Sequence, residues 1–227
     1  GGVAITGVTG NGTWRYSSDG IVWTGFGSIT STQALLLDAN QQVRYVPDGL
    51  NGEAVGFSFV AWDQTTGTAS VAGTPGYADA GSGGGTTAYS SQSGSVSMTV
   101  TAVNDAPWLD NSKTPTLRAE DEDAGTPSGA VGTLISTLID FATPTGQVDN
   151  VMDVDHGAML GIALTAANTT NGSWYYSTND GATWTVVSAV SDTNALLLSA
   201  NASTRIYFQP NANYNGTISN AITFRVW

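Results

Sequence analysis

The sequence predicts an all-β fold made of two tandem copies of one β-sandwich unit. Short alternating or β-branched runs, bounded by Gly, Asn, Asp and Ser, recur throughout the chain, whereas helical periodicity is nearly absent. One long stretch of sequence also occurs twice. Because 227 residues allow one large or two ordinary domains, and seven or so short strands suit a sandwich, the repeat predicts two sandwich units.

The repeat is ordered and domain-sized. Residues 11–17 read NGTWRYS, and residues 171–177, 160 positions further on, read NGSWYYS. The same later signals follow each copy in the same order: an Asp-Gly turn (19–20, 180–181), Trp-Thr (Trp23, Trp184), Ala-Leu-Leu-Leu (34–37, 195–198), Ala-Asn (39–40, 200–201), a Pro (Pro47, Pro210), Asn-Gly (51–52, 215–216) and Phe-x-x-Trp (59–62, 224–227). Such a repeat indicates a modular array.

The expected strands follow the apolar runs between turn signals. In the first copy they are residues 3–8, 12–17, 34–37, 43–46, 56–62 and 95–103. In the second they are 162–166, 173–177, 195–198, 205–209 and 221–227, preceded by 116–119 and 132–138 at the front of that unit. Asn-Gly and Asp-Gly pairs tolerate positive φ and therefore predict the hairpin turns.

Residues 65–92 have a different character. They contain seven Gly, ten Ser or Thr and almost no large apolar residue except Tyr77 and Tyr89, which predicts a long surface loop. Two interpretations stay open. The loop is either a lid or binding loop, or a polar insertion without a function, because loops tolerate insertions at little cost.

The register of the repeat divides the chain into residues 1–107 and 108–227. Residues 2–4 match 161–163 in mid-unit, so we expect the first unit to lack its opening strands and the second to lack a counterpart to 95–103. An open sheet edge invites pairing with another chain. The segment is then either part of a longer array or a subunit completed by strand donation into a filament, with residues 95–103 or the strands from 116 to 138 in a neighbour's sheet.

Composition excludes several functional classes. The formal net charge of −12, from six Lys and Arg against eighteen Asp and Glu, repels nucleic acid and anionic lipid and suits cations. Without cysteine there is no disulfide, thiol nucleophile or thiolate metal site. The sequence shows no apolar run of 18 residues and no N-terminal basic and apolar signal, so we expect no membrane insertion by this segment.

The motif Val103-Asn104-Asp105-Ala106-Pro107 marks the unit boundary and carries a family resemblance. Together with Leu117 to Asp123 (LRAEDED), Asp153 to Gly157 (DVDHG), Gly161 to Thr165 (GIALT) and Asn171 to Trp174 (NGSW), in this order, it resembles the cadherin-like and VCBS-type repeats of large bacterial surface adhesins. The resemblance covers most of the chain. It implies an immunoglobulin-like sandwich in an exported, calcium-dependent array, secreted or at the cell surface.

Ten of the eighteen acidic residues fall between Asp105 and Asp155, opposed only by Lys113 and Arg118. Gathered carboxylates repel one another, and Ca²⁺, which takes six to eight oxygen ligands, relieves that repulsion better than Mg²⁺. The resemblance places the ligands around an inter-domain site: Asn104, Asp105, Glu120, Asp121, Glu122, Asp153 and Asp155. The alternative is a solvated acidic loop without a tight ion site.

The sequence contains few residue patterns that would indicate an enzyme active site. His156, the only histidine, directly follows the Asp153-x-Asp155 pair, but Ca²⁺ prefers oxygen and a catalytic triad needs a partnered Ser and Asp, so we expect an exposed loop residue. The carboxylates cluster at a junction without a sign of a glycosidase cleft, and no Gly-rich loop opens a helix to hold phosphate. We do not expect an enzyme.

The repeated tryptophans have two interpretations. Trp14, Trp23 and Trp62 match Trp174, Trp184 and Trp227, and their repetition favours core packing over a carbohydrate-binding face. Trp108 has no counterpart and is expected to pack at the domain junction.

Two functions follow. The first is a calcium-rigidified structural or adhesin repeat that acts as spacer, stalk or fibre element beside neighbouring repeats of the same or identical chains. The alternative is a module that binds a cell-surface glycan or protein through exposed aromatics or residues 65–92. Burial of the aromatic side chains discriminates between them.

Overall fold

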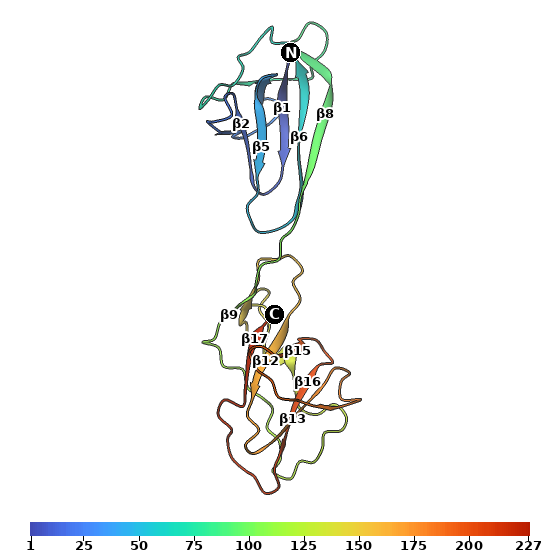
Figure 1. The fold of residues 1–227 in the computed structure, drawn as a ribbon. Coiled ribbons are helices and arrows are strands. Elements are labelled where there is room, and N and C mark those ends of the chain that lie inside the picture. Colours follow the sequence, from blue (N-terminus) through green and yellow to red (C-terminus); the bar gives the residue numbers. More distant parts are fainter. The chain divides into compact units, whose positions relative to one another are not determined.

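The computed structural model describes all 227 residues and is all-β, with no α-helix, which confirms the predicted class. The chain divides into two compact units, Gly1–Val103 and Asn104–Trp227 (Figure 1). Each unit is described by itself below.

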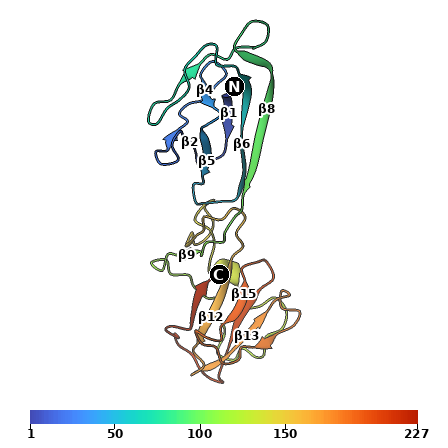
Figure 2. The same cartoon turned by 45° about the horizontal axis from the view of Figure 1, so that its top comes forward.

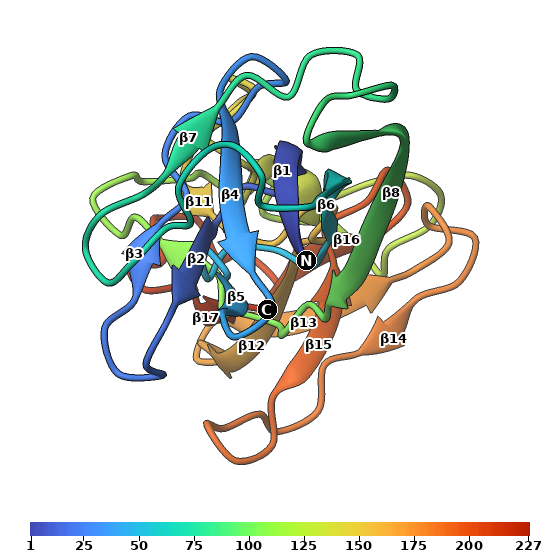
Figure 3. The ribbon, with the colours of Figure 1, turned by 90° about the horizontal axis from the view of Figure 1, so that it is seen from above.

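The first unit contains a five-stranded and a three-stranded antiparallel sheet. The larger sheet has the order β7-β4-β1-β6-β8 (Figure 3), with β1 (Gly2–Thr9), β4 (Ala34–Asp38), β6 (Glu53–Trp62), β7 (Tyr77–Ala78) and β8 (Tyr89–Val100). The smaller has the order β3-β2-β5, with β2 (Thr13–Ser17), β3 (Thr24–Gly25) and β5 (Gln42–Val46).

Apolar side chains from both sheets form the core of the first unit. Ile5 and Leu35 of the larger sheet belong to the same buried cluster as Trp14 and Tyr16 of β2, together with Phe26. This is the arrangement of a sandwich, in which alternate residues of each strand point into the space between two sheets.

The larger sheet is covered on its other face as well, which corrects the prediction for residues 65–92. Ala80, Ala88 and Tyr89 are buried in one cluster with Leu36 and Trp62 of the sheet. The backbone N–H of Ser70 donates to the Leu36 carbonyl over 2.9 Å. The segment is loop apart from β7 and the start of β8, but it packs on the sheet, which explains why β4 is buried on both faces.

The second unit repeats this plan. One sheet has the order β15-β12-β17 (Figure 2), with β12 (Gly161–Ala167), β15 (Leu196–Ser199) and β17 (Ile222–Val226). The other has the order β10-β16-β13-β14, with β10 (Thr133–Leu134), β13 (Gly172–Ser177), β14 (Thr185–Val186) and β16 (Arg205–Pro210). Beside them lie the two-stranded sheet of β9 (Trp108–Leu109) and β11 (Val151–Met152) and the 3-10 helix η1 (Ile135–Thr137).

The sequence repeat is a structural repeat down to its irregularities. β1 pairs with β4 and β6 as β12 pairs with β15 and β17, and β2 lies between β3 and β5 as β13 lies between β14 and β16. A register shift interrupts β1 against β6 between Ile5 and Gly7, and β12 against β17 between Leu164 and Ala166. These positions match in the sequence repeat, so both copies encode the same β-bulge.

The front of the second unit differs from its prediction. Residues 116–119 form no strand, and of residues 132–138 only Thr133 and Leu134 pair, before the chain turns into η1. The Arg118 N–H donates to the Thr133 hydroxyl over 2.8 Å, so a side chain takes the place of a strand partner. Ile135, Leu138 and Ile139 then enter the main core cluster, which makes this segment a source of core residues.

Candidate functional site

The start of the second unit brings four of the predicted calcium ligands together. The backbone N–H of Asp105 donates to Oδ2 of Asp155 over 2.7 Å, and the N–H of Asp155 donates to Oδ1 of Asp153 over 2.8 Å. Asn104 donates from Nδ2 to the Asp105 carbonyl over 2.8 Å. Residues 50 positions apart in the sequence are thus connected at one place, with Asp105 exposed and the two other carboxylates half-buried.

The other predicted ligands make contacts elsewhere in the unit. Glu122 accepts a hydrogen bond from Nδ2 of Asn215 over 3.1 Å, and Asp121 is exposed, its carbonyl accepting the N–H of Ala124. Glu120 and Glu122 line a cavity of about 350 Å³ beside Trp174 and Phe208. Burial raises the pKa of the Glu120 carboxyl, an effect that Arg118 opposes and Asp121 reinforces.

The seven predicted ligands do not form one coordination shell. In the structure no three His, Asp or Glu side chains are gathered as preformed ligands of one metal ion. Asp105, Asp153 and Asp155 are joined through their backbone, and one oxygen of Asp155 is already engaged by the Asp105 N–H. His156, next to this turn, is exposed, and Gly157 beside it has a φ of +80°.

Asp140, which belongs to the same acidic stretch, organises a loop. Its carboxylate accepts the backbone N–H groups of Gln147 and, over 3.0 Å, of Val148, and its Oδ1 also accepts the N–H of Asp149. The buried Asn150 completes the loop, because its side chain accepts the Asp140 N–H and donates to the Leu138 carbonyl. This carboxylate satisfies backbone donors, a role that acidic composition alone does not distinguish from ion binding.

The tryptophan near the start of each repeat is a core residue. Trp14 and Trp174 are buried, and each indole N–H donates over 2.9 Å to a backbone carbonyl, of Thr9 and of Asn168 respectively. Each ring also contacts the aromatic ring opposite it, with centroid distances of 5.0 Å to Tyr45 and 4.9 Å to Phe208. Neither ring is available as a flat stacking platform for a sugar.

The other tryptophans differ in exposure. Trp62 is buried, whereas its counterpart Trp227 is 48% exposed. Trp23 and Trp184 are half-buried; Trp23 lies under the Arg44 guanidinium, at 4.1 Å from the ring centroid, and Trp184 packs edge-on against Tyr207. Trp108 is 55% exposed and forms β9 with Leu109.

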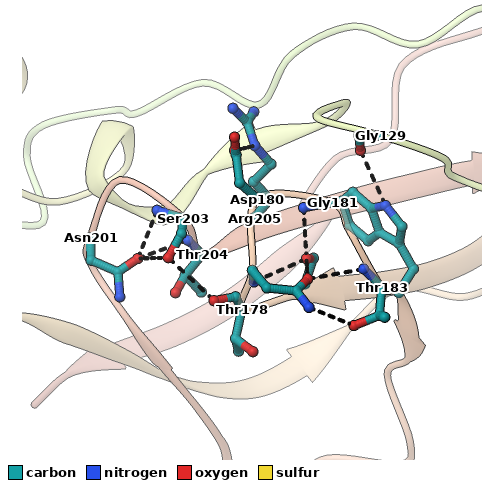
Figure 4. A network of polar contacts seen from close by, with 12 residues as sticks. Gly129, Thr178, Asp180, Gly181, Thr183, Asn201, Ser203, Thr204 and Arg205 are labelled. Atoms are coloured by element: carbon teal, nitrogen blue, oxygen red, sulfur yellow. Dashed lines mark hydrogen bonds and ion pairs between the residues drawn. The ribbon is translucent and has the colours of Figure 1, made fainter.

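A dense network of polar contacts surrounds the turn after β13 (Figure 4). Asn201 accepts the backbone N–H groups of Ser203 and Thr204, and the Arg205 guanidinium contacts the Asp180 carboxylate over 2.6 Å. Asn179 accepts the Thr183 N–H through Oδ1 over 2.9 Å. The Asn201 and Asn179 contacts hold backbone N–H groups and the Arg205–Asp180 ion pair joins two side chains, so this network stabilises a turn.

No helix in the structure has the length and apolar character needed to cross a membrane. Comparison of the chain with protein-family models, with curated proteins and with solved structures found no match.

Proposed function

We propose that this chain is a structural repeat module of a calcium-dependent extracellular array, made of immunoglobulin-like sandwiches that serve as spacer, stalk or fibre element. The observation that carries the proposal is the repetition of one sheet topology, including its bulge, in both units. A unit that is repeated with its irregularities and can be stacked in series suits an extended array.

The placement of the aromatic residues supports this role over ligand binding. Trp14 and Trp174, which repeat in both units, are buried against neighbouring rings. A glycan-binding face would carry such rings on the surface. Blank glycan arrays are therefore expected for the purified chain, and specific binding to a glycan would contradict the structural role.

Calcium is part of the proposal, at the start of the second unit. Asn104, Asp105, Asp153 and Asp155 would hold the ion, because their carboxylate and carbonyl oxygens are the donors that Ca²⁺ prefers. Bound there, Ca²⁺ would supply positive charge that offsets carboxylate repulsion. Glu120 and Glu122 are left out of this set because they line the cavity beside Trp174.

Titration calorimetry of the metal-free chain tests the calcium site. We expect saturable Ca²⁺ binding that the double variant Asp153→Asn, Asp155→Asn abolishes. Asp192→Asn is the matched control, because Asp192 is exposed and its carboxylate contacts only Arg225, over 3.4 Å. Equal Ca²⁺ binding by both variants, or no binding by the unmodified chain, would contradict the proposed site.

A further inference from the structure

The smaller sheet of the first unit carries two arginines side by side. β2 and β5 are neighbouring strands (Figure 1), and Arg15 of β2 faces Arg44 of β5 in their antiparallel register. Their neighbours along the strands, Trp14, Tyr16 and Tyr45, belong to the core cluster or pack against it, so both arginines point away from the core. Directly opposed residues have Cβ atoms about 4.5 to 5.5 Å apart, so the two arginines share one patch of the sheet face.

This pair has no anionic partner within the chain. Arg15 and Arg44 are the only basic side chains of the first unit, whereas both ion pairs of the chain lie in the second unit. The Nε atom of Arg15 is also the only buried side-chain polar atom without a hydrogen-bond partner. Like charges directly opposite each other destabilise a sheet, and a buried unpaired N–H group adds to that cost. The arrangement therefore lacks a negative group that contacts both arginines.

The second unit carries uncharged residues at the same positions. A row of three residues crosses the sheet in each unit: Gly25, Arg15 and Arg44 on β3, β2 and β5, and Val186, Tyr175 and Tyr207 on β14, β13 and β16. Strand pairing in this fold thus requires no charge in the row. The three adjacent positions differ together, which points to one shared role for the glycine and the two arginines.

Glycine and tryptophan shape the surface around the arginines. A Cβ atom added at Gly25 would have no atom within 4 Å apart from its chain neighbours, so there is open space beside Arg15. On the other strand, the Arg44 guanidinium lies over the Trp23 ring, at 4.1 Å from the centroid. This cation–π contact holds the guanidinium by its face, and its N–H groups, which lie in the guanidinium plane, remain able to donate to a ligand.

We propose that Arg15 and Arg44 form a binding site for a phosphate group, a function that goes beyond the structural role. Two guanidinium groups carry two positive charges. A phosphate group carries about −1.5 to −2 at pH 7 and offers three acceptor oxygens, so it neutralises both, whereas a carboxylate neutralises only one. Because the net charge of −12 repels polyanions such as nucleic acid and anionic membranes, the ligand is a small phosphate compound.

NMR titration of the calcium-free chain with inorganic phosphate tests the proposal. We expect saturable shifts of the Arg15 and Arg44 side-chain N–H signals and of the Trp23 indole signal at millimolar phosphate. The indole signal of Trp184, the equivalent residue of the second unit, is the internal reference and should not move. Glycerol phosphate, titrated in parallel, identifies the source of the group: tighter binding than inorganic phosphate indicates a phosphate ester, and equal or weaker binding indicates the free ion.

Variants separate this site from the overall charge of the chain. Arg15→Gln and Arg44→Gln should each weaken phosphate binding about tenfold or more, because each removes charge-assisted hydrogen bonds. Arg225→Gln is the matched control: it removes one positive charge from an exposed position in the second unit and should change the affinity less than about twofold. Gly25→Val, which introduces the side chain of the second unit, should weaken binding by filling the space beside Arg15, while circular dichroism stays unchanged.

The outcomes that would overturn the proposal are specific to these residues. They are the absence of a saturable shift, shifts confined to other residues, or equal weakening of phosphate binding by Arg44→Gln and Arg225→Gln. Since the titration is done without Ca²⁺, and the proposed calcium ligands belong to the other unit, its result does not depend on the calcium site.

Discussion

At the scale of single residues, the equivalent turns of the two units are held by side chains of different chemistry. In the first unit, Oδ1 of Asp19 accepts the backbone N–H groups of Ile21 and Val22, both over 2.8 Å. In the second unit, Asn179 takes this role, while Asp180, the residue that matches by sequence, contacts Arg205. A neutral amide oxygen thus replaces a carboxylate at an equivalent turn.

This replacement predicts a pH-dependent stability for the first turn. Backbone hydrogen bonds from Ile21 and then Val22, with the Ser17 hydroxyl, lower the pKa of Asp19 in the folded state. The stability it contributes is present above its unfolded pKa of about 4 and is lost as pH falls through the lower folded value. In urea unfolding, Asp19→Ala should destabilise at pH 7 and less at pH 3, whereas Asp19→Asn should keep most of the stability, as Asn179 does. Equal losses for both variants at pH 7 would contradict this.

Glu120 predicts the opposite dependence. Its pKa is raised, mainly by burial, so the folded state favours the protonated carboxyl. That contribution is present below the unfolded pKa of about 4.3 and is lost as pH rises through the folded value. We therefore expect Glu120→Gln to stabilise the chain at pH 7, in the presence of chelator, and to have little effect near pH 3.5. Glu122→Gln, at an exposed position, is the control and should change the free energy of unfolding at pH 7 less than Glu120→Gln does.

At the scale of elements, the strands in which apolar and polar residues alternate are predictable from the sequence. The prediction is wrong where strand pairing depends on residues far away in the sequence. The residues of β1, β2, β4, β5 and β6 and their counterparts were predicted, because apolar periodicity and turn residues are local signals. The two-residue strands β3, β7, β9, β11 and β14 were missed because they carry no period. Residues 116–119 were wrongly predicted because a β-like composition does not supply a partner strand.

In the candidate site, too, some contacts were expected before the structure and others depend on how the chain folds. Only the family resemblance implies that Asp105 lies near the Asp153 to Asp155 turn; in the structure hydrogen bonds join these residues. The separate contacts of Glu120 and Glu122 depend on how residues 117–122 pack against Trp174 and Asn215, which sequence spacing does not encode. The role of Asp140 was missed, because the loop it holds brings three backbone N–H groups to one carboxylate only once folded.

The triple leucine of the repeat offers a test of what residues 65–92 do. Leu36 and Leu197 occupy the same position, yet only Leu36 is buried, under that segment. Leu36→Ala should therefore lower the free energy of unfolding by about 2 to 5 kcal/mol. Leu197→Ala is the matched control and should cost less than about 1 kcal/mol, because its side chain is largely exposed. Urea unfolding at neutral pH measures both, and similar losses would mean that the segment does not protect the sheet face.

At the scale of the whole molecule, charge is distributed unevenly between the two units. Twelve of the eighteen acidic residues lie in Asn104–Trp227, with four of the six basic residues. The proposed calcium ligands all belong to this unit. A bound ion should therefore stabilise one unit and leave the other unchanged, because ligand binding stabilises only the folded state that contains the site.

Differential scanning calorimetry with calcium and with chelator tests the central claim, that this is a calcium-dependent structural module, most directly. A hundredfold excess of Ca²⁺ over its dissociation constant stabilises by about 2.7 kcal/mol, which raises the Tm of a unit of this size by roughly 10 °C. We predict such a shift for the second unit alone, with the transition of the first unit unchanged and the shift abolished by Asp153→Asn, Asp155→Asn. Identical melting profiles with calcium and with chelator would contradict the claim.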